Sequence, residues 1–325
     1  MILDVTYRSI FRVIGVLVGL WLVYQVLDIL AITFFGIIIA ATLAPEVDKI
    51  QKEGVPRLLG AILIYILLGL LLVLVGYIIL PPSLAEISRL SSDLPGLLKE
   101  SLGSLSLPQQ FFDKLAESFS NASTDIFAWF IGLAGGLGNI LFVVIISFYL
   151  TVEDEGIKRF LAHALPESTY KYVLDLITRS QHTLSQWLKA QLLLMLLVGI
   201  MSFFALTFIG IPNALALATF AGLMEVVPFI GPVIAAVPAL IFALNVSPVT
   251  ALVVLAAFTV IQQVEGQVLT PQIMKRTFAI NPIIVLIAVY IGGKLGGIIG
   301  VLASVPLLAL VLEFSKDYYA KLRIK

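Results

Sequence analysis

Four ionisable side chains lie within or at the edge of long apolar stretches of this sequence: Asp28, Glu225, Glu265 and Lys294. Placing a charge at the centre of a membrane helix costs about 2.5–3.5 kcal/mol, so each charge calls for a partner or a function. Glu225 is expected to take up and release a proton, or to hold a cation together with nearby carbonyl groups. Asp28 is expected to mark an external turn and to have a structural role.

Glu265 stands in a polar stretch, QQVEGQVLTPQ, with Gln262, Gln263 and Gln267 around it. Spacings of three and four residues place these side chains on adjoining faces of a helix. A polar stripe at membrane depth must face protein or water, so we expect Glu265 and the glutamines to line a site. Lys294 is expected either to neutralise one of the carboxylates or to extend toward the membrane interface.

Two apolar stretches are interrupted at their midpoints by residues that break helices. The first, 213–244, is interrupted by four residues: Glu225, Pro228, Gly231 and Pro232. The second, 281–312, begins at Asn281 and is interrupted by these: Gly292, Gly293, Lys294, Gly296 and Gly297. Each half is about 18 Å long as a helix, which is too short for a hydrocarbon core of about 30 Å. Both segments are therefore predicted to be re-entrant hairpins; kinked full spans are the alternative.

Prolines and glycines at membrane depth have a chemical consequence. Proline removes a backbone donor and clashes with a preceding carbonyl, while glycine lets a second backbone or a solute approach closely. Irregular backbone inside a membrane is tolerated where it is buried in protein or lines a wet cavity. The freed backbone groups of the two interruptions are thus expected to serve as ligands, and simple packing of kinked helices is the other interpretation.

The amino-acid composition predicts the environment in which this chain folds. Of its 325 residues 60% are hydrophobic and 12% are charged, with a mean hydropathy of +1.08. A soluble domain carries about 25% charged residues, so the chain is predicted to reside in a lipid bilayer. The formal net charge of zero argues against a nucleic-acid partner. The absence of cysteine excludes disulfides and thiolate metal sites.

The predicted fold is all-α and polytopic, with about six full spanning helices plus the two hairpins. Four windows qualify as full spans: 57–80, 127–152, 190–210 and 247–264. Residues 10–45 are expected to form two helices split near Asp28; one long helix with an interfacial piece is the alternative. The distribution of lysine and arginine predicts cytoplasmic N- and C-termini. The two hairpins would then enter from opposite faces, as in secondary transporters with a midplane site.

Amphipathic helical regions are expected between the spans, external at 81–125 and cytoplasmic at 153–189. Their apolar stripes are expected to lie on the membrane surface or to cap the bundle, with a partner-binding face as the alternative. These regions, with Gly15 and Gly19 at dimer-motif spacing, favour a homo-oligomer. The chain divides accordingly into membrane helices, amphipathic regions and a C-terminal transport region: 1–80, 81–125, 126–152, 153–189 and 190–325.

Three segments carry a resemblance to the AI-2E family of bacterial membrane proteins, the autoinducer-2 exporters: VPFIGPVIAAVP (227–238), QQVEGQVLTPQI (262–273) and INPIIVLIAVYIGGKLGGIIGVLASVPLLA (280–309). The first segment matches the family's proline, aromatic and Ile-Gly-Pro pattern. In the second, Gly266 stands where asparagine is common, which departs from the pattern. The resemblance covers essentially the full length. It implies export of a small polar signal across a bacterial inner membrane, and some relatives are described as cation/proton antiporters.

The expected function is secondary transport of a small polar solute or ion by alternating access, with carboxylates at the hairpin tips. The partners expected are the bilayer, the solute and further copies of the chain; no cofactor is expected beyond coupling to H⁺ or Na⁺. A Na⁺/H⁺ antiporter and a scaffold or regulatory membrane subunit are the alternatives. An enzyme is not expected, because the sequence has no His-Glu-x-x-His helix and no paired-aspartate motif. The predicted site residues are Glu225, Pro228, Gly231, Pro232, Gln262, Gln263, Glu265, Gln267, Asn281, Gly293 and Lys294.

Overall fold

The computed structural model describes residues 7–71, 137–274 and 281–323, together with positions 73, 74, 77, 110 and 114. All regular structure in these described residues is helical, which confirms the all-α part of the predicted fold class. Three described helices are long and apolar enough to cross a membrane: Ile29–Lys52, Thr169–Ile209 and Pro248–Ile273. The windows 57–80 and 127–152 lie partly outside the described residues, as does nearly all of the predicted external region 81–125.

Helix α1 (Tyr7–Lys52) is continuous through the region that was expected to hold two helices. The predicted split near Asp28 is therefore wrong. Between Leu20 and Phe35 the sequence has neither glycine nor proline. A single aspartate in a helix interior costs less than about 1 kcal/mol, which is too little to break the helix.

Helix α4 (Leu137–Val152) packs across α1. The apolar helix Arg57–Leu71 is attached to α4 by partly buried polar contacts. The Tyr65 hydroxyl donates to Ser147 Oγ at 2.9 Å and lies 3.0 Å from Thr151 Oγ1. Hydroxyl groups that pair with one another satisfy their hydrogen bonds without water. These contacts fix one apolar helix against another where neither could be held by the hydrophobic effect alone in lipid.

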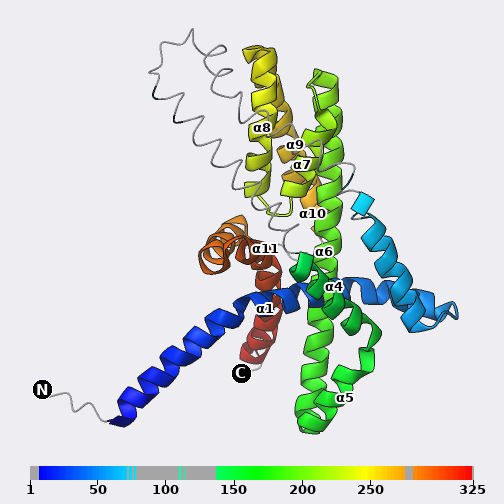
Figure 1. The fold of residues 1–325 in the computed structure, drawn as a ribbon, viewed down its shortest axis with the longest axis vertical. Coiled ribbons are helices and arrows are strands. Elements are labelled where there is room, and N and C mark those ends of the chain that lie inside the picture. Colours follow the sequence, from blue (N-terminus) through cyan, green and yellow to red (C-terminus); the bar gives the residue numbers. More distant parts are fainter. Residues whose placement is uncertain are drawn as a thin grey trace, which may run out of the picture.

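Helix α6 (Glu167–Ile209) lies at the centre of the described helices and contacts α1, α7, α9 and α11. It follows the short amphipathic helix α5 (Asp154–Ala164). The predicted cytoplasmic region and the predicted span at 190–210 thus share one continuous helix. Gly210, at φ 83°, ends α6 in the left-handed conformation that commonly closes helices. Figure 1 shows α6 running the length of the molecule, with α1 crossing its lower half.

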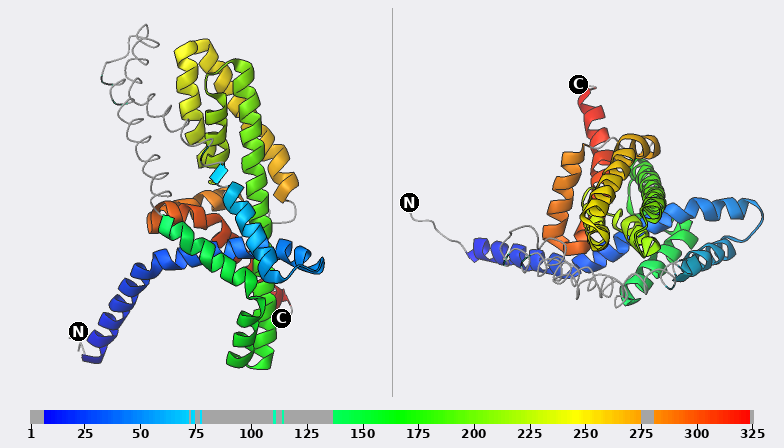
Figure 2. Two further views of the ribbon diagram at one scale, coloured as in Figure 1. Left: turned by 45° about the vertical axis from the view of Figure 1, so that its right-hand side comes forward. Right: turned by 90° about the horizontal axis from the view of Figure 1, so that it is seen from above.

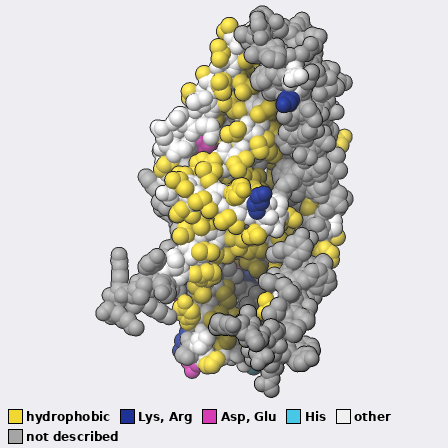
Figure 3. All heavy atoms as spheres, turned by 90° about the vertical axis from the view of Figure 1, so that its left-hand side faces the viewer, with side chains coloured by type: hydrophobic (Ala, Val, Ile, Leu, Met, Phe, Trp, Pro, Cys, Tyr) yellow, Lys and Arg dark blue, Asp and Glu magenta, His cyan; other side chains and the backbone are white. Residues whose placement is uncertain are grey.

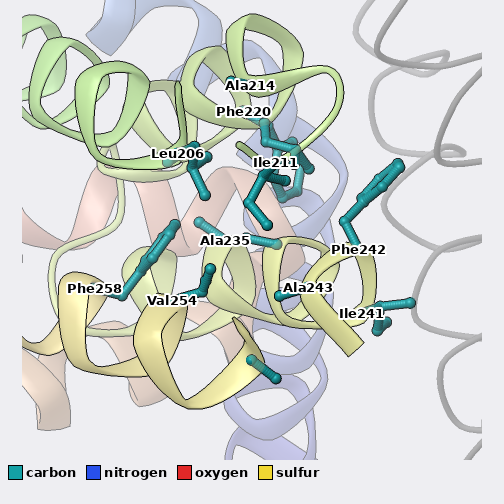
Figure 4. Packing of buried hydrophobic residues seen from close by; sticks show 14 of the residues in the cluster. Leu206, Ile211, Ala214, Phe220, Ala235, Ile241, Phe242, Ala243, Val254 and Phe258 are labelled. Carbon is teal, nitrogen blue, oxygen red and sulfur yellow. The ribbon is translucent and has the colours of Figure 1, made fainter. Parts of the chain in front are cut away.

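The first broken segment forms a hairpin of two short helices, α7 (Ala214–Met224) and α8 (Ile230–Val246). Helix α7 packs against both α6 and α8, and α8 packs against α9 (Pro248–Val264). In Figure 1 the hairpin stands beside α6 and α9, with its turn toward the middle of the molecule. Apolar side chains from all four helices make its core, including Leu206, Phe220, Ala235 and Phe258, which Figure 4 shows converging.

The second broken segment lies in α11 (Pro282–Arg323), which also folds back on itself. The helical backbone is interrupted at Gly296 and at Gly297, whose φ is 54°. A Cβ atom on Gly292 would lie 2.3 Å from the Gly300 carbonyl oxygen, so the two arms touch backbone to backbone. Figure 2 shows the bend between the first arm (orange) and the second arm (red).

The outer surface of the described chain is strongly apolar. Large hydrophobic side chains are exposed on every long helix, such as Leu67 on the helix Arg57–Leu71, Leu196 on α6 and Val249 on α9. Figure 3 shows one face on which hydrophobic side chains cover most of the described part and charged groups are few. Soluble monomers rarely expose apolar patches of this extent, so this surface suits contact with lipid tails.

Candidate functional site

The turn Glu225–Phe229 joins α7 to α8 and forms the tip of the first hairpin. Its backbone is held by hydrogen bonds from Val227 N to the Met224 carbonyl oxygen (3.1 Å) and from Gly231 N to the Val227 carbonyl oxygen (2.9 Å). Phe229 has φ 66°, a left-handed conformation that costs energy in a residue with a side chain. Such local strain persists only where the surrounding structure imposes it, and it is frequent at functional sites.

The predicted tip residues Pro228, Gly231 and Pro232 have distinct structural roles. A Cβ atom on Gly231 would lie 1.8 Å from the Met224 carbonyl oxygen. Only glycine therefore allows these two backbone segments to approach so closely. Pro232 is buried in the first turn of α8, where its missing N–H costs no intrahelical hydrogen bond. Pro228 is half-buried within the turn. These three residues build the tip on which Glu225 is carried.

Glu225 is almost completely buried, with 1% of its surface exposed. Its Oε2 atom accepts no hydrogen bond from any described residue. It also follows the last residue of α7, where the carbonyl end of the helix disfavours negative charge. The carboxyl group of Glu225 is thus an acceptor that the described protein leaves available.

Gln191 on α6 is the closest polar support of this tip, and sequence reasoning missed it. Its Nε2 atom donates to the backbone carbonyl oxygen of Glu225 at 2.6 Å, and only 1% of the residue is exposed. Its Oε1 atom is buried without a partner among the described residues. The signal available in the sequence was an isolated amide at the start of the apolar run QLLLMLLVGIM.

Glu265 lies where α9 passes into the π-helix η1 (Glu265–Leu269), which leads to the short helix α10 (Thr270–Ile273). The Thr270 hydroxyl donates to Glu265 Oε1 at 3.2 Å. Single-turn π-helices occur frequently at functional sites, because the wider turn disturbs the regular backbone hydrogen bonds. The carboxyl groups of Glu225 and Glu265 interact electrostatically. Helix η1 also contacts α6, which carries Gln191, so both acidic residues that the sequence singled out lie beside α6.

Only part of the predicted glutamine stripe is buried. Gln262 and Glu265 are half-buried, whereas Gln263 and Gln267 are exposed. Gln267 Nε2 donates to Gln263 Oε1, so these two amides bind each other on the outer face. Gln262 is consequently the glutamine best placed to share a buried site with Glu265.

The remaining predicted residues lie on α11 or directly before it. Asn281 Oδ1 accepts from Ile283 N at 2.9 Å and so caps the start of that helix. Gly293 is half-buried, and its Cβ position would lie 3.2 Å from Val301 Cγ2 across the hairpin. Lys294 is exposed, with its Nζ atom 6.0 Å from the ring centroid of Tyr290. No described contact links Lys294 to either carboxylate, so the predicted charge neutralisation is not what the structure displays.

The two hairpins contribute side chains to one apolar cluster. Val227, in the tip of the first hairpin, packs against a cluster that contains Val289 and Val305 from the two arms of α11. The same cluster includes Ile38 of α1 and Trp187 of α6. The tip that carries Glu225 therefore packs against a cluster that the second hairpin shares with α1 and α6.

The described residues contain no group of three or more His, Asp or Glu side chains that could hold a metal ion. The oxygen atoms found around the tip are those of the Glu225 carboxylate, the Gln191 amide and the backbone carbonyl groups. Such oxygens suit a proton, a monovalent cation or a ligand rich in hydrogen-bond donors.

Comparison with known proteins relates this arrangement to membrane transport. A profile described as "AI-2E family transporter" matches residues 10–320. Three similar proteins share the name "Putative transport protein". YrrI of Bacillus subtilis is 26% identical, covering 93% of this chain and 89% of its own length. YueF of the same organism is 28% identical (86% and 83%), and YhhT of Escherichia coli is 26% identical (88% and 83%).

Proposed function

Because the chain belongs to the AI-2E transporter family, it is a multi-pass membrane transporter and not an enzyme, and we propose that it exports a small polar solute. The solute class that we favour is a signal molecule of the autoinducer-2 kind, rich in hydroxyl groups. The proposed mechanism is alternating access, in which the two hairpins move against α1 and α4. Glu225 and Glu265 are the proposed binding and coupling carboxylates.

One observation carries this proposal: Glu225 Oε2 and Gln191 Oε1 are both buried acceptors without partners among the described residues, on residues joined by a hydrogen bond. A buried acceptor left unsatisfied costs about 1–3 kcal/mol, so a ligand that donates hydrogen bonds to both atoms gains from the pairing. Hydroxyl groups of a small polar solute are donors of this kind. Glu265, whose Oε1 accepts from Thr270, is the second acidic group that we propose for the site.

The site also has features that favour motion. It is formed at the tip of a hairpin rather than within a rigid span, and the neighbouring α9 changes there to a π-helix. Transporters commonly place their sites where discontinuous helices expose backbone groups near the bilayer midplane. We propose that residues 190–325 form the transport region, with Pro228, Gly231 and Pro232 shaping the tip. In this scheme Gln262 and Gly293 border the site, and Gln263, Gln267, Asn281 and Lys294 support it from outside.

Sodium/proton exchange is the second candidate. It is favoured by the electrostatic interaction between two acidic side chains, Glu225 at the hairpin tip and Glu265 at the start of the π-helix. Two neighbouring carboxyls can exchange a proton for a cation, because the bound charge relieves their mutual repulsion. This candidate uses the same residues with a different cargo.

We further propose that the chain resides in a bacterial inner membrane as a homo-oligomer with cytoplasmic termini. The re-entrant nature of the two hairpins and their entry from opposite faces belong to the same proposal. Each of these points concerns the setting of the site and leaves its chemistry unchanged.

The test is transport by purified protein in liposomes. Counterflow of candidate solutes, with and without sodium and pH gradients, is expected to identify the cargo. Glu225→Gln and Glu265→Gln should abolish flux in folded protein, while Glu167→Gln, which alters an exposed carboxylate on α6, should leave flux unchanged. Dye-reported proton movement driven by sodium would select the exchanger. If wild-type protein alone moved none of these solutes or ions, the scaffold alternative would replace transport.

A further inference from the structure

Helix α6 carries buried polar atoms that meet no protein partner in the described part of the chain: Ser180 Oγ, Trp187 Nε1, Gln191 Oε1 and Ser202 Oγ. These residues follow one another at spacings of seven, four and eleven. At about 3.6 residues per turn, such spacings place all four on one face of the helix. Glu225 Oε2, on the adjoining hairpin tip, is a fifth atom of this kind.

The chemistry of these atoms indicates what they bind. More than about 90% of buried polar groups in native proteins have a hydrogen-bond partner from protein or ordered water. The indole nitrogen of Trp187 can only donate, whereas the oxygens of Gln191 and Glu225 are acceptors. A cation satisfies only acceptors, and an anion satisfies only donors. Water both donates and accepts, so, unlike an ion, it can satisfy every one of these atoms.

The face is not uniform along the helix. Between Ser180 and Gln191 the buried residue Thr183 adds a further hydroxyl, and the polar positions follow at intervals of about 4–6 Å along the axis. Arg179, next to Ser180, forms an ion pair with the buried Glu313 of α11 at 3.3 Å, which makes this end of the face polar. Polar groups thus follow at nearly every turn from this end, with one buried leucine on the same face, Leu184, which packs with Trp187 in the apolar cluster that includes Val289.

Beyond Gln191 the same face becomes apolar. About 16 Å of helix separate Gln191 from Ser202, and buried Leu194 and Val198 occupy the interval. Helix α7 closes against it here, since a Cβ atom on Gly222 would lie 2.7 Å from the Met195 carbonyl oxygen. Backbones in such close contact leave no room for water between them.

We propose that Glu225 is reached by water along a one-sided path on α6, open from the Ser180 end and sealed toward the Ser202 end. Leu194, Val198 and the contact between α6 and α7 at Gly222 form the seal. This inference goes beyond the proposed function, because it states which end of the molecule communicates with the site in this conformation, whatever the cargo. It also gives Ser180, Thr183 and Trp187 a role as lining residues.

Because the chain has no native cysteine, single-cysteine variants report on water access directly. Ser180→Cys, Thr183→Cys, Gln191→Cys and Ser202→Cys are to be placed in lipid nanodiscs, where both membrane faces are open to reagent. The reagent is a small cationic methanethiosulfonate, which reacts with the thiolate and therefore needs water at the sulfur. Glu167→Cys gives the rate for an exposed position, and Leu192→Cys the rate for a position facing lipid.

The matched comparison is Ser180 against Ser202, since both are serines on one face of one helix with a buried, unpartnered hydroxyl among the described residues. We expect labelling to be at least about tenfold faster at Ser180→Cys, Thr183→Cys and Gln191→Cys than at Ser202→Cys and Leu192→Cys. A tenfold ratio of rates corresponds to a difference of about 1.4 kcal/mol in the free energy of exposing the thiol to reagent. The proposal is overturned if the first three react no faster than Leu192→Cys, or if Ser202→Cys reacts as fast as Ser180→Cys. A Gln191→Cys protein that fails to elute as a folded species is replaced by Trp187→Cys, read against the same thresholds.

Labelling does not depend on flux, so the two proposals can fail separately. Rapid labelling at Ser180 and Thr183 with normal flux in Glu225→Gln keeps the path and removes the carboxylate mechanism. Loss of flux in Glu225→Gln with no labelling along α6 removes the path and keeps the carboxylate.

Discussion

Gln191 on α6 donates a 2.6 Å hydrogen bond to the backbone carbonyl oxygen of Glu225, and each residue is only 1% exposed. The bond joins residues 34 positions apart in the chain and holds the tip of a helical hairpin against α6. It leaves one oxygen on each side chain available. The same two residues therefore hold the hairpin tip in place and supply the acceptors of the proposed site.

Gln191→Ala is expected to lower the free energy of unfolding by about 1–3 kcal/mol, because it strands a buried carbonyl oxygen. The measurement is thermal unfolding of the purified protein in detergent. Gln186→Ala is the matched control, since Gln186 lies on the same helix and bonds to His182 on an exposed face. Equal unfolding temperatures for the two variants would show that the bond to Glu225 contributes little.

Gly231→Ala is expected to disrupt the hairpin tip, since the new Cβ atom would meet the Met224 carbonyl oxygen at 1.8 Å. Overpacking against a backbone atom costs about 3 kcal/mol when the neighbour cannot move. Gly266→Ala provides the control, because no heavy atom lies within 4 Å of its Cβ position. Chemical unfolding should separate the two variants, and a Gly231→Ala protein as stable as Gly266→Ala contradicts the close crossing of the chain at this tip.

Gly300→Ala is expected to force apart the two arms of α11, because its Cβ atom would lie 2.0 Å from the Gly292 carbonyl oxygen. Gly296→Ala, in the same segment but with open space around its Cβ position, should be tolerated. The yield of monodisperse protein on size-exclusion chromatography measures the difference. Should both variants behave as wild type, the close contact between the arms would be refuted.

Arg179→Gln is expected to destabilise the protein by about 3 kcal/mol, since it deprives the buried Glu313 of its salt bridge across α6 and α11. Lys171→Gln removes an exposed pair with Glu167 on the same helix and should cost no more than about 0.5 kcal/mol. The comparison is made by thermal unfolding at low and high salt. A loss that is equal in the two variants would argue against a buried role for Glu313.

The positions of the two hairpins were predictable because their causes are local. Proline and glycine act on the backbone within a few residues, so the interruptions at Glu225–Pro232 and Gly292–Gly297 mark the turns that the structure contains. The same local logic explains the error in α1. An aspartate at position 28 looked like a turn, yet no neighbouring residue released the backbone, and the helix continues.

By itself, then, the sequence determined that this protein belongs in a lipid bilayer, that it is helical, and where its apolar segments fold back. Composition and local backbone chemistry decide these properties, and both can be read along the chain. Only the tertiary structure decided that Gln191 supports Glu225, that the charge of Glu265 acts on Glu225, and that Lys294 is exposed with no described contact to either carboxylate. Those facts depend on how helices distant in sequence cross one another, and packing of many side chains sets the crossings.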